Sequence, residues 1–349
     1  MIKIIVFLVG FFSIKTVVDA GQFKTIEPHF EGSCNSIFGL EGPEDIIILD
    51  DGRAFISSDP RRKALSESLS LYSYEEKDIN SNQGSIFYYD LNNQKLQNLT
   101  SHLEFEFHPH GISIYKSLDE KIYLNAVSHT SEGHYVVSFI LDGNKLILKE
   151  KISDPLLVSP NDLVMINENQ FYITNDHGSK KMRGKLIEDY LQLARSNVLF
   201  YDGLNFKICQ NKLQYANGIN ISKDFKTLYV TESVGKKVTV YNRDTKSNDI
   251  HLIKTIDVNS GLDNVELDQD GNLWIGSHPK MFDFIKHAKN KNYYSPSQVI
   301  MISSKDNEIK EVFLSDGSNL SGSSVAALYN NNLLIGAVFE DHFLHCVLD

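Results

Sequence analysis

The amino-acid sequence predicts an all-β fold, a six-bladed β-propeller with one or more short helices over one face. Six copies of a short motif recur, each with two polar or small residues before an aliphatic one. Their first polar residues lie at positions 44, 110, 161, 217, 263 and 323, intervals of 66, 51, 56, 46 and 60 residues. Repeats of about 40–50 residues or slightly more are typical of propeller blades with four strands each.

The motif and its spacing are supported by a third observation: each copy is followed by a segment of strand-like composition. Examples are residues 46–57, 164–175, 220–232 and 266–276. Further β-type segments span residues 86–91, 121–127, 134–141, 145–152, 237–241 and 333–339. Asp-Gly pairs at 51–52, 142–143, 202–203, 270–271 and 316–317 mark turns between them.

The motifs themselves predict a ring of polar side chains. The innermost strand of every propeller blade starts at the same end of the central channel, so residues at these starts converge on the axis. The predicted ring consists of Glu44, Asp45, Asn161, Asp162, Asn217, Asp263 and Asn264.

This ring contains carboxylates and carboxamides and no cysteine, which favours a hard cation. Calcium accepts six to eight such oxygen ligands in flexible geometry. Without a cation the clustered carboxylates would repel one another at low dielectric. We therefore expect calcium in the central channel. The alternative is that the Asn-Gly and Asp-Asn pairs are ordinary turn residues.

Composition excludes several classes of protein. At 349 residues the chain could form one large domain or two smaller ones, and 42% hydrophobic residues are ample for a core. A net charge of −11 and a pI near 5.5 argue against a nucleic-acid partner. The sequence lacks GxGxxG, P-loop, GxSxG and HExxH motifs.

Residues 1–20 have the pattern of a secretory signal. Lys3 precedes an apolar run over residues 4–14, and Val18 and Ala20 stand at the −3 and −1 positions of a cleavage site. We expect cleavage after Ala20, secretion, and one propeller domain over residues 21–349. Retention as an N-terminal membrane anchor is the alternative, because Lys15 interrupts the run, although the run is short for a span.

The three cysteines agree with export. Cys34 precedes the first repeat and Cys346 lies near the end of the chain. Because the chain ends meet in a closed propeller, we predict a Cys34–Cys346 disulfide that closes the ring. Cys209 is then a free thiol, more consistent with a buried than a reactive group.

Three sequons stand at Asn98, Asn220 and Asn319. Asn220 begins an inner strand, so we expect it to stay unmodified. Asn98 and Asn319 lie in polar, loop-like stretches and are the predicted glycosylation sites.

Two stretches break the β pattern. Residues 59–83 are long and polar and indicate a mobile excursion. Residues 184–195 carry apolar residues at helical spacing and predict an amphipathic helix across one face of the ring. That helix either packs on the propeller or forms the wall or lid of a pocket.

At these motifs the chain resembles the paraoxonase/arylesterase family of calcium-dependent lactonases. The matching stretches occur in order from about Cys34 to Cys346 and cover every blade. They are residues 42–45, 54–58, 109–113, 161–162, 174–177, 216–222, 263–264 and 273–276. The family fold is a six-bladed propeller, in agreement with the repeat count.

The resemblance implies two calcium ions with separate ligand sets. The catalytic ion would be held by Glu44, Asn161, Asn217, Asp263 and Asn264, and a structural ion by Asp45, Asp162 and the main-chain carbonyl of Ile112. The implied function is a secreted calcium-dependent hydrolase of lactones and aryl esters. Its substrates would be small lactones or esters, and a lipoprotein or membrane surface is a candidate partner.

Hydrolysis also needs a base for the attacking water. His110 is the first polar residue of the second motif copy, so it should face the channel. His129, which follows the next strand, could orient it there. Both correspond to the family's proposed histidine pair, and Asp263 is a competing base or nucleophile. Asp176, His177 and His278 would shape the pocket, and Ser277 stands where the family often has a cysteine.

Two other functions remain open at this point. Some membrane-anchored relatives act as assembly partners of other proteins, so a non-catalytic, membrane-tethered propeller with a binding or chaperone-like role is the main alternative. A strictosidine-synthase-like or gluconolactonase-like propeller shares the fold but fits the His110/His129 pair less well. Residues 59–83 are longer than usual for the family, which leaves substrate size open.

Overall fold

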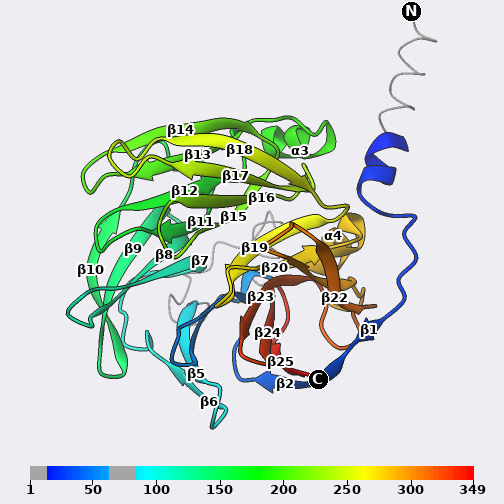
Figure 1. The fold of residues 1–349 in the computed structure, drawn as a ribbon, viewed down its shortest axis with the longest axis horizontal. Coiled ribbons are helices and arrows are strands. Elements are labelled where there is room, and N and C mark those ends of the chain that lie inside the picture. Colours follow the sequence, from blue (N-terminus) through cyan, green and yellow to red (C-terminus); the bar gives the residue numbers. More distant parts are fainter. Residues whose placement is uncertain (1–13, 63–82) are drawn as a thin grey trace, which may run out of the picture.

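The computed structural model describes residues 14–62 and 83–349, whose strands form six antiparallel sheets around a central axis (Figure 1). The predicted six-bladed β-propeller is confirmed. In each blade the first strand of the sheet contacts the first strands of the neighbouring blades, so these strands form the inner ring. The inner strands are β3 (Pro43–Ile48), β7 (Pro109–Lys116), β11 (Pro160–Met165), β15 (Ala216–Ile221), β19 (Gly261–Leu267) and β23 (Ser323–Tyr329).

The other strands follow outward in sequence order, except that β2 from the N-terminal region is the outer strand of the sixth blade. The second strands are β4 (Arg53–Ser58), β8 (Ile122–Thr130), β12 (Phe171–Asn175), β16 (Thr227–Glu232), β20 (Leu273–His278) and β24 (Asn332–Ala337). The third strands are β5 (Ser85–Asp90), β9 (Gly133–Asp142), β13 (Ser196–Tyr201), β17 (Lys237–Arg243), β21 (Ser297–Ile302) and β25 (His342–Leu348). The outer strands are β6 (Lys95–Asn98), β10 (Lys145–Ile152), β14 (Phe206–Leu213), β18 (Ile250–Asp257), β22 (Ile309–Ser315) and β2 (Gly32–Phe38).

The aliphatic residue of each motif packs between blades. These residues are at most 2% exposed, and each belongs to a hydrophobic cluster that includes neighbouring strands. They are Ile46, Ile112, Leu163, Ile219, Val265 and Val325. Burial of each stabilises the fold by roughly 1.5–3 kcal/mol, and it fixes the height of the preceding polar residues in the channel.

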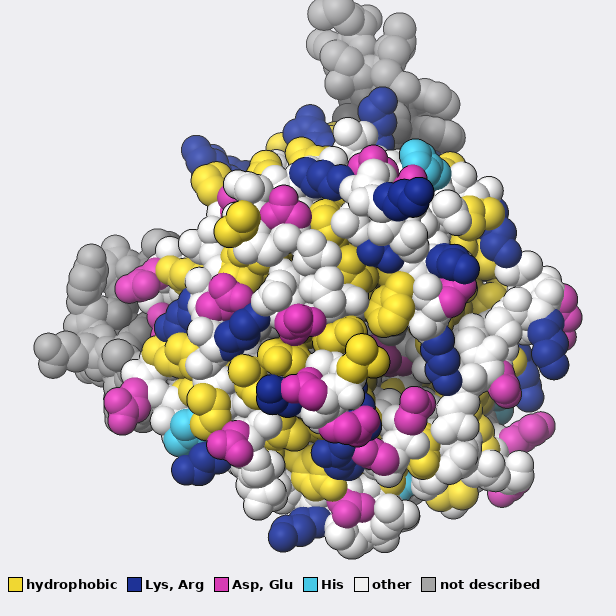
Figure 2. Space-filling model, turned by 60° about the vertical axis from the view of Figure 1, so that its left-hand side comes forward, with side chains coloured by type: hydrophobic (Ala, Val, Ile, Leu, Met, Phe, Trp, Pro, Cys, Tyr) yellow, Lys and Arg dark blue, Asp and Glu magenta, His cyan; other side chains and the backbone are white. Residues whose placement is uncertain are grey.

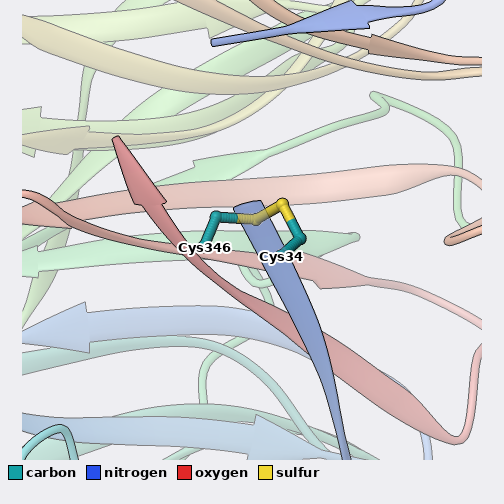
Figure 3. Close-up of a disulfide and its surroundings, with 2 residues drawn as sticks. All are labelled: Cys34 and Cys346. Carbon is teal, nitrogen blue, oxygen red and sulfur yellow. A yellow bond between two sulfur atoms is a disulfide. The ribbon is translucent and has the colours of Figure 1, made fainter. Parts of the chain in front are cut away.

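The ring is closed by the two ends of the chain. Strand β2, from the N-terminal region, pairs with β25 and supplies the outer strand of the sixth blade. Cys34 and Cys346 lie opposite each other in this pairing and form a disulfide across 312 positions of sequence (Figure 3). The predicted disulfide is therefore present. A short strand, β1 (His29–Phe30), extends the fifth blade beside β22.

The helix after the third blade differs from its prediction. Strand β12 is followed by α3 (Met182–Tyr190), which starts and ends earlier than residues 184–195. Leu186 and Ile187 are 45% and 53% exposed, whereas Glu188 is 4% exposed. The amphipathic prediction was wrong because Glu188 accepts hydrogen bonds from the Gly178 amide and the Ser179 hydroxyl, which turns the apolar side chains outward.

A second helix, α4 (Met281–Lys289), follows β20 and was not predicted. It lies on the same side of the ring as α3 in Figure 1, and residues 14–19 add a further helical turn. Residues 14–62 and 83–349 contain no helix with the length and apolar character that a membrane crossing requires. Most of the proposed anchor and most of the 59–83 excursion lie outside the described residues. On the face in Figure 2, acidic and basic side chains are interspersed.

Candidate functional site

The fold gathers the predicted polar residues at one end of the channel. All seven of them, Glu44, Asp45, Asn161, Asp162, Asn217, Asp263 and Asn264, are at most 6% exposed. Asn264 donates from Nδ2 to Glu44 Oε1 at 2.9 Å, although the two residues are 220 positions apart in sequence. These residues lie within inner strands, so the alternative interpretation as turn residues is wrong.

Four buried oxygens in this ring lack a hydrogen-bond partner among the described residues. They are Glu44 Oε2, Asn161 Oδ1, Asn217 Oδ1 and Asn264 Oδ1. A buried acceptor without a partner is costly, so a cluster of them in a native fold requires an explanation. An ion coordinated by these oxygens would supply it.

The amide nitrogens explain why these oxygens are available. Asn217 Nδ2 donates to Ser233 Oγ at 3.0 Å, and Asn161 Nδ2 lies 3.4 Å from Asp176 Oδ2. Asn264 Nδ2 is held by Glu44, as described above. Each amide nitrogen thus donates to a protein acceptor, while each amide oxygen has no hydrogen-bond donor among the described residues.

Glu44 carries a full negative charge at the centre of this cluster. Burial alone would raise its pKa, but the interactions with His110 and the Arg61 guanidinium and the hydrogen bond from Asn264 outweigh burial and lower the pKa to about 2. His110 Nε2 lies 3.3 Å from Glu44 Oε1, and the Arg61 guanidinium lies 3.7 Å from Glu44 Oε2.

Asp45 and Asp162 are held differently. Asp45 Oδ2 accepts the Ile112 amide at 2.7 Å, and Asp162 Oδ2 accepts the Ile219 amide at 2.8 Å, so each carboxylate links its strand to the next inner strand. Burial raises the pKa of both carboxyls, and the charges of Glu44 on Asp45 and of Asp45 on Asp162 raise them further. A bound cation would offset this repulsion.

Sequence reasoning missed a further carboxyl near the ring, that of half-buried Glu266. Glu266 lies on β19 just after the register shift between Leu262 and Val265, and it pairs with Trp274 of β20. Burial raises its pKa, as does the nearby charge of Asp45. Because a register shift interrupts the alternation along β19, the spacing of residues did not identify Glu266 from sequence.

The histidines form a chain of three rather than the predicted pair. His110 Nδ1 and His129 Nε2 are 2.9 Å apart, which brings the two predicted histidines together. His129 Nδ1 in turn lies 2.8 Å from Nδ1 of His134, which sequence reasoning missed. His129 on β8 and His134 on β9 are paired across a hairpin, a register that the short turn between them could have predicted.

Asp263 of the ring is in contact with His278. His278 Nε2 lies 2.8 Å from Asp263 Oδ2, and its ring stacks on Phe284 of α4 with centroids 3.9 Å apart. Burial raises the pKa of Asp263, with the His278 interaction opposing it. The unpredicted helix α4 therefore supplies an aromatic wall beside the polar ring.

Comparison with known proteins decides the family. The model of the Arylesterase family matches residues 24–348. This chain belongs to the arylesterase family. Serum paraoxonase/arylesterase 2 of Gallus gallus is 34% identical over 93% of this chain and 91% of that protein. Serum paraoxonase/arylesterase 1 of Homo sapiens is 32% identical, with the same shares covered. Serum paraoxonase/lactonase 3 of Oryctolagus cuniculus is 33% identical over 94% of this chain and 92% of that protein.

Solved structures support the propeller fold. A gluconolactonase from Xanthomonas campestris matches with a TM-score of 0.53 and 13% identity, over 94% of this chain and 99% of that chain. Regucalcin from Agrobacterium tumefaciens, described as a calcium-binding protein, matches with a TM-score of 0.54 and 12% identity, over 91% and 95%. The resemblance to the arylesterase family predicted from the motifs is thus confirmed.

In this arylesterase family member the other two predicted pocket residues support the ring. His177 Nδ1 lies 2.6 Å from Asp176 Oδ1, and its Nε2 lies 3.0 Å from Asp189 Oδ1 of α3. Although burial opposes it, these two carboxylates raise the pKa of His177 to about 9, so the imidazole is charged at neutral pH. Asp176 also contacts Asn161, so this charged group fixes a ring residue.

Arg61 reaches the site from outside the repeated motifs. Its guanidinium donates to the Pro109 carbonyl at 2.7 Å and lies beside Glu44. No repeat pattern could have placed it there.

The predicted glycosylation sites differ in exposure. Asn319 is exposed. Asn98 is half-buried, and its Nδ2 donates to Ser85 Oγ at 3.0 Å. Both remain predictions, with Asn319 in the more accessible environment.

Proposed function

We propose that the protein is a secreted, calcium-dependent hydrolase of lactones and aryl esters. The carrying observation is the set of four buried oxygens without partners, which lies beside the histidine chain. Membership of the arylesterase family supports a hydrolase of small esters or lactones.

The ring residues suit a catalytic calcium ion. Glu44 and Asp263 contribute two negative charges, and Asn161, Asn217 and Asn264 contribute neutral oxygens, so one divalent ion balances the set. When bound, calcium would polarise the substrate carbonyl and stabilise the oxyanion formed during attack.

A second, structural ion would be held by Asp45, Asp162 and the Ile112 carbonyl. Support for it is the charge of two buried carboxyls that repel each other. The backbone amides that these carboxylates already accept fix their positions in the channel.

His110 is the proposed base. In the form with its proton on Nδ1, Nε2 accepts the proton of the attacking water while the water oxygen bonds to the carbonyl carbon. Collapse of the tetrahedral intermediate then breaks the bond to the leaving alkoxide. His129 orients His110 through the 2.9 Å contact at Nδ1. Asp263 is the competing base, although His278 already occupies its Oδ2.

The test is a panel of simple lactones and phenyl acetate, assayed with calcium and after EDTA treatment. We expect EDTA to abolish turnover and calcium to restore it. Asn217→Ala and Asp263→Ala should lower kcat by 10²-fold or more, and His110→Gln should lower it by about 10²-fold, as loss of a general base does. Full turnover in folded, metal-free protein would contradict the proposal.

Secretion after removal of residues 1–20 is the proposed route, supported by relatives that are named serum enzymes. Sequencing the mature N-terminus tests it, because a chain that starts at Gly21 has lost the proposed anchor.

A lipoprotein or membrane surface is the proposed partner of the face of the propeller that carries α3. Apolar side chains of α3 are 45–65% exposed: Met182, Leu186, Ile187 and Tyr190. Leu186→Ser with Ile187→Ser should reduce flotation with phosphatidylcholine vesicles, whereas equal flotation would exclude this role for α3.

The alternative of a tethered, non-catalytic propeller with a binding or chaperone-like role makes different predictions. It requires an uncleaved N-terminus and no turnover across the lactone panel in folded, calcium-loaded protein. A cleaved and active protein would exclude it.

A further inference from the structure

We propose that His134 is the third member of a proton relay, which connects the base His110 through half-buried His129 to solvent. This inference rests on the proposed hydrolase function and extends it by one residue. His110 Nδ1 lies 2.9 Å from His129 Nε2, and His129 Nδ1 lies 2.8 Å from His134 Nδ1, both within hydrogen-bond distance.

The geometry allows one continuous set of donors and acceptors. Each neutral imidazole has one N–H and one acceptor nitrogen. In the starting form the protons lie on His110 Nδ1, His129 Nδ1 and His134 Nε2. His110 then donates to His129, His129 donates to His134, and His110 Nε2 is free to accept a proton from water.

Proton transfer along this chain balances without a new charge in the core. When His110 Nε2 takes a proton, its Nδ1 proton passes to His129 Nε2. The Nδ1 proton of His129 passes to His134 Nδ1, and the Nε2 proton of His134 leaves to solvent. The reverse transfers, with His110 Nε2–H protonating the leaving alkoxide, restore the starting form.

The surroundings of His129 favour transfer over storage of the proton. Burial lowers its pKa well below the usual value, and the neighbouring His110 and His134 lower it further. An imidazolium at His129 is therefore costly, so a proton that arrives on one side of the ring must leave from the other.

His134 has the accessibility that an exit requires. It is half-buried and lies near the exposed turn residues Ser131 and Glu132. The charged groups near it are Lys185 of α3, Lys180 and Asp176. A substrate seated over the ring would cover His110, whereas His134 on β9 would still reach solvent.

The experiment compares His134→Ala and His134→Asn in the full-length, calcium-loaded protein. Asparagine places an acceptor near the Nδ1 position, so it can hold His129 but cannot pass a proton on. The readout is kcat for a fast aryl ester at low and high imidazole concentration. His251→Asn, an exposed histidine on outer strand β18, is the matched control.

We expect both variants to lose about tenfold in kcat at low buffer, less than the loss of the base itself, and to recover at high imidazole. KM and Tm should stay unchanged, and the control should match wild type. Normal activity of His134→Asn would mean that His134 only orients His129, which overturns the relay. Normal activity of both variants, or a loss that imidazole does not rescue, overturns it as well.

The two proposals fail in different ways. Wild-type protein without turnover on any lactone or ester would reject the hydrolase function, and the relay with it. Active wild-type protein with unaffected His134 variants would reject the relay alone.

Discussion

Removal of the proposed calcium should destabilise the whole propeller. Four buried oxygens in the ring have no hydrogen-bond partner in the described part of the chain, and a buried polar group without a hydrogen bond costs about 1–3 kcal/mol. The four together represent roughly 4–12 kcal/mol, against a free energy of unfolding of about 5–15 kcal/mol for a typical domain.

The stabilisation that an experiment can observe depends on how tightly the folded protein binds calcium and on the calcium concentration. With free calcium at 100 to 1,000 times its Kd, the folded state gains about 2.7–4.1 kcal/mol. At about 2–4 °C per kcal/mol for a large domain, EDTA should lower Tm by about 5–15 °C. The measurement is thermal unfolding in calcium, in EDTA, and after calcium is restored.

A matched pair of variants distinguishes loss of a proposed calcium ligand from loss of any asparagine on the same inner strand. Asn217 and Asn220 lie on the same strand, but both side-chain groups of Asn220 are already bonded, to the Val265 carbonyl and the Ile221 amide. Asn217→Ala should remove most of the calcium-dependent rise in Tm, whereas Asn220→Ala should retain it. A Tm that is identical in calcium and EDTA, or equal responses of the two variants, would refute the reasoning.

Three further predictions concern groups outside the ring. The pKa of His177 is raised to about 9, so its ion pairs contribute stability that is fully present below pH 6.5 and is lost as pH rises through 9. The wild-type Tm should therefore fall between these pH values, and His177→Gln should make that fall smaller. An equal fall in the variant would contradict the assignment. Opening the Cys34–Cys346 disulfide frees a loop of about 300 residues and should cost up to about 5 kcal/mol, seen as a lower Tm in the Cys34→Ser/Cys346→Ser variant than in wild type. Burial raises the pKa of the Cys209 thiol to about 11, so a thiol reagent at pH 8 should react slowly with native protein and rapidly after unfolding; fast native reaction would show an accessible thiolate.

The sequence was sufficient for the ring because recurrence identifies equivalent structural positions. Glu44 and Asn264 are far apart in the chain, yet the same motif precedes an inner strand at both, so their contact followed from the fold. Closure through Cys34 and Cys346 followed from the same argument.

The groups around the ring were harder to predict because they depend on side-chain contacts between unlike segments. The spacing of apolar residues in α3 indicated a buried face, but hydrogen bonds to Glu188 determine which side faces inward. Arg61 enters from a connection outside the repeats, and α4, like α3, lies in the connection between the second and third strands of its blade. His134 required knowledge of the hairpin register.

The inner strands explain why a propeller can keep unpaired oxygens at its axis. The aliphatic residue after each polar pair is buried between blades, so the hydrophobic effect holds the strand in place whether or not the polar oxygens are satisfied. The amide nitrogens of Asn161 and Asn217 are bound to side chains of their own blades, which directs the oxygens to the shared axis. Because packing fixes these ligands before any ion binds, the ordering cost of binding is low and the ion gains most of the available interaction. The same rigid strands hold His110 beside Glu44, so the proposed base and the proposed ion site keep a fixed position relative to each other.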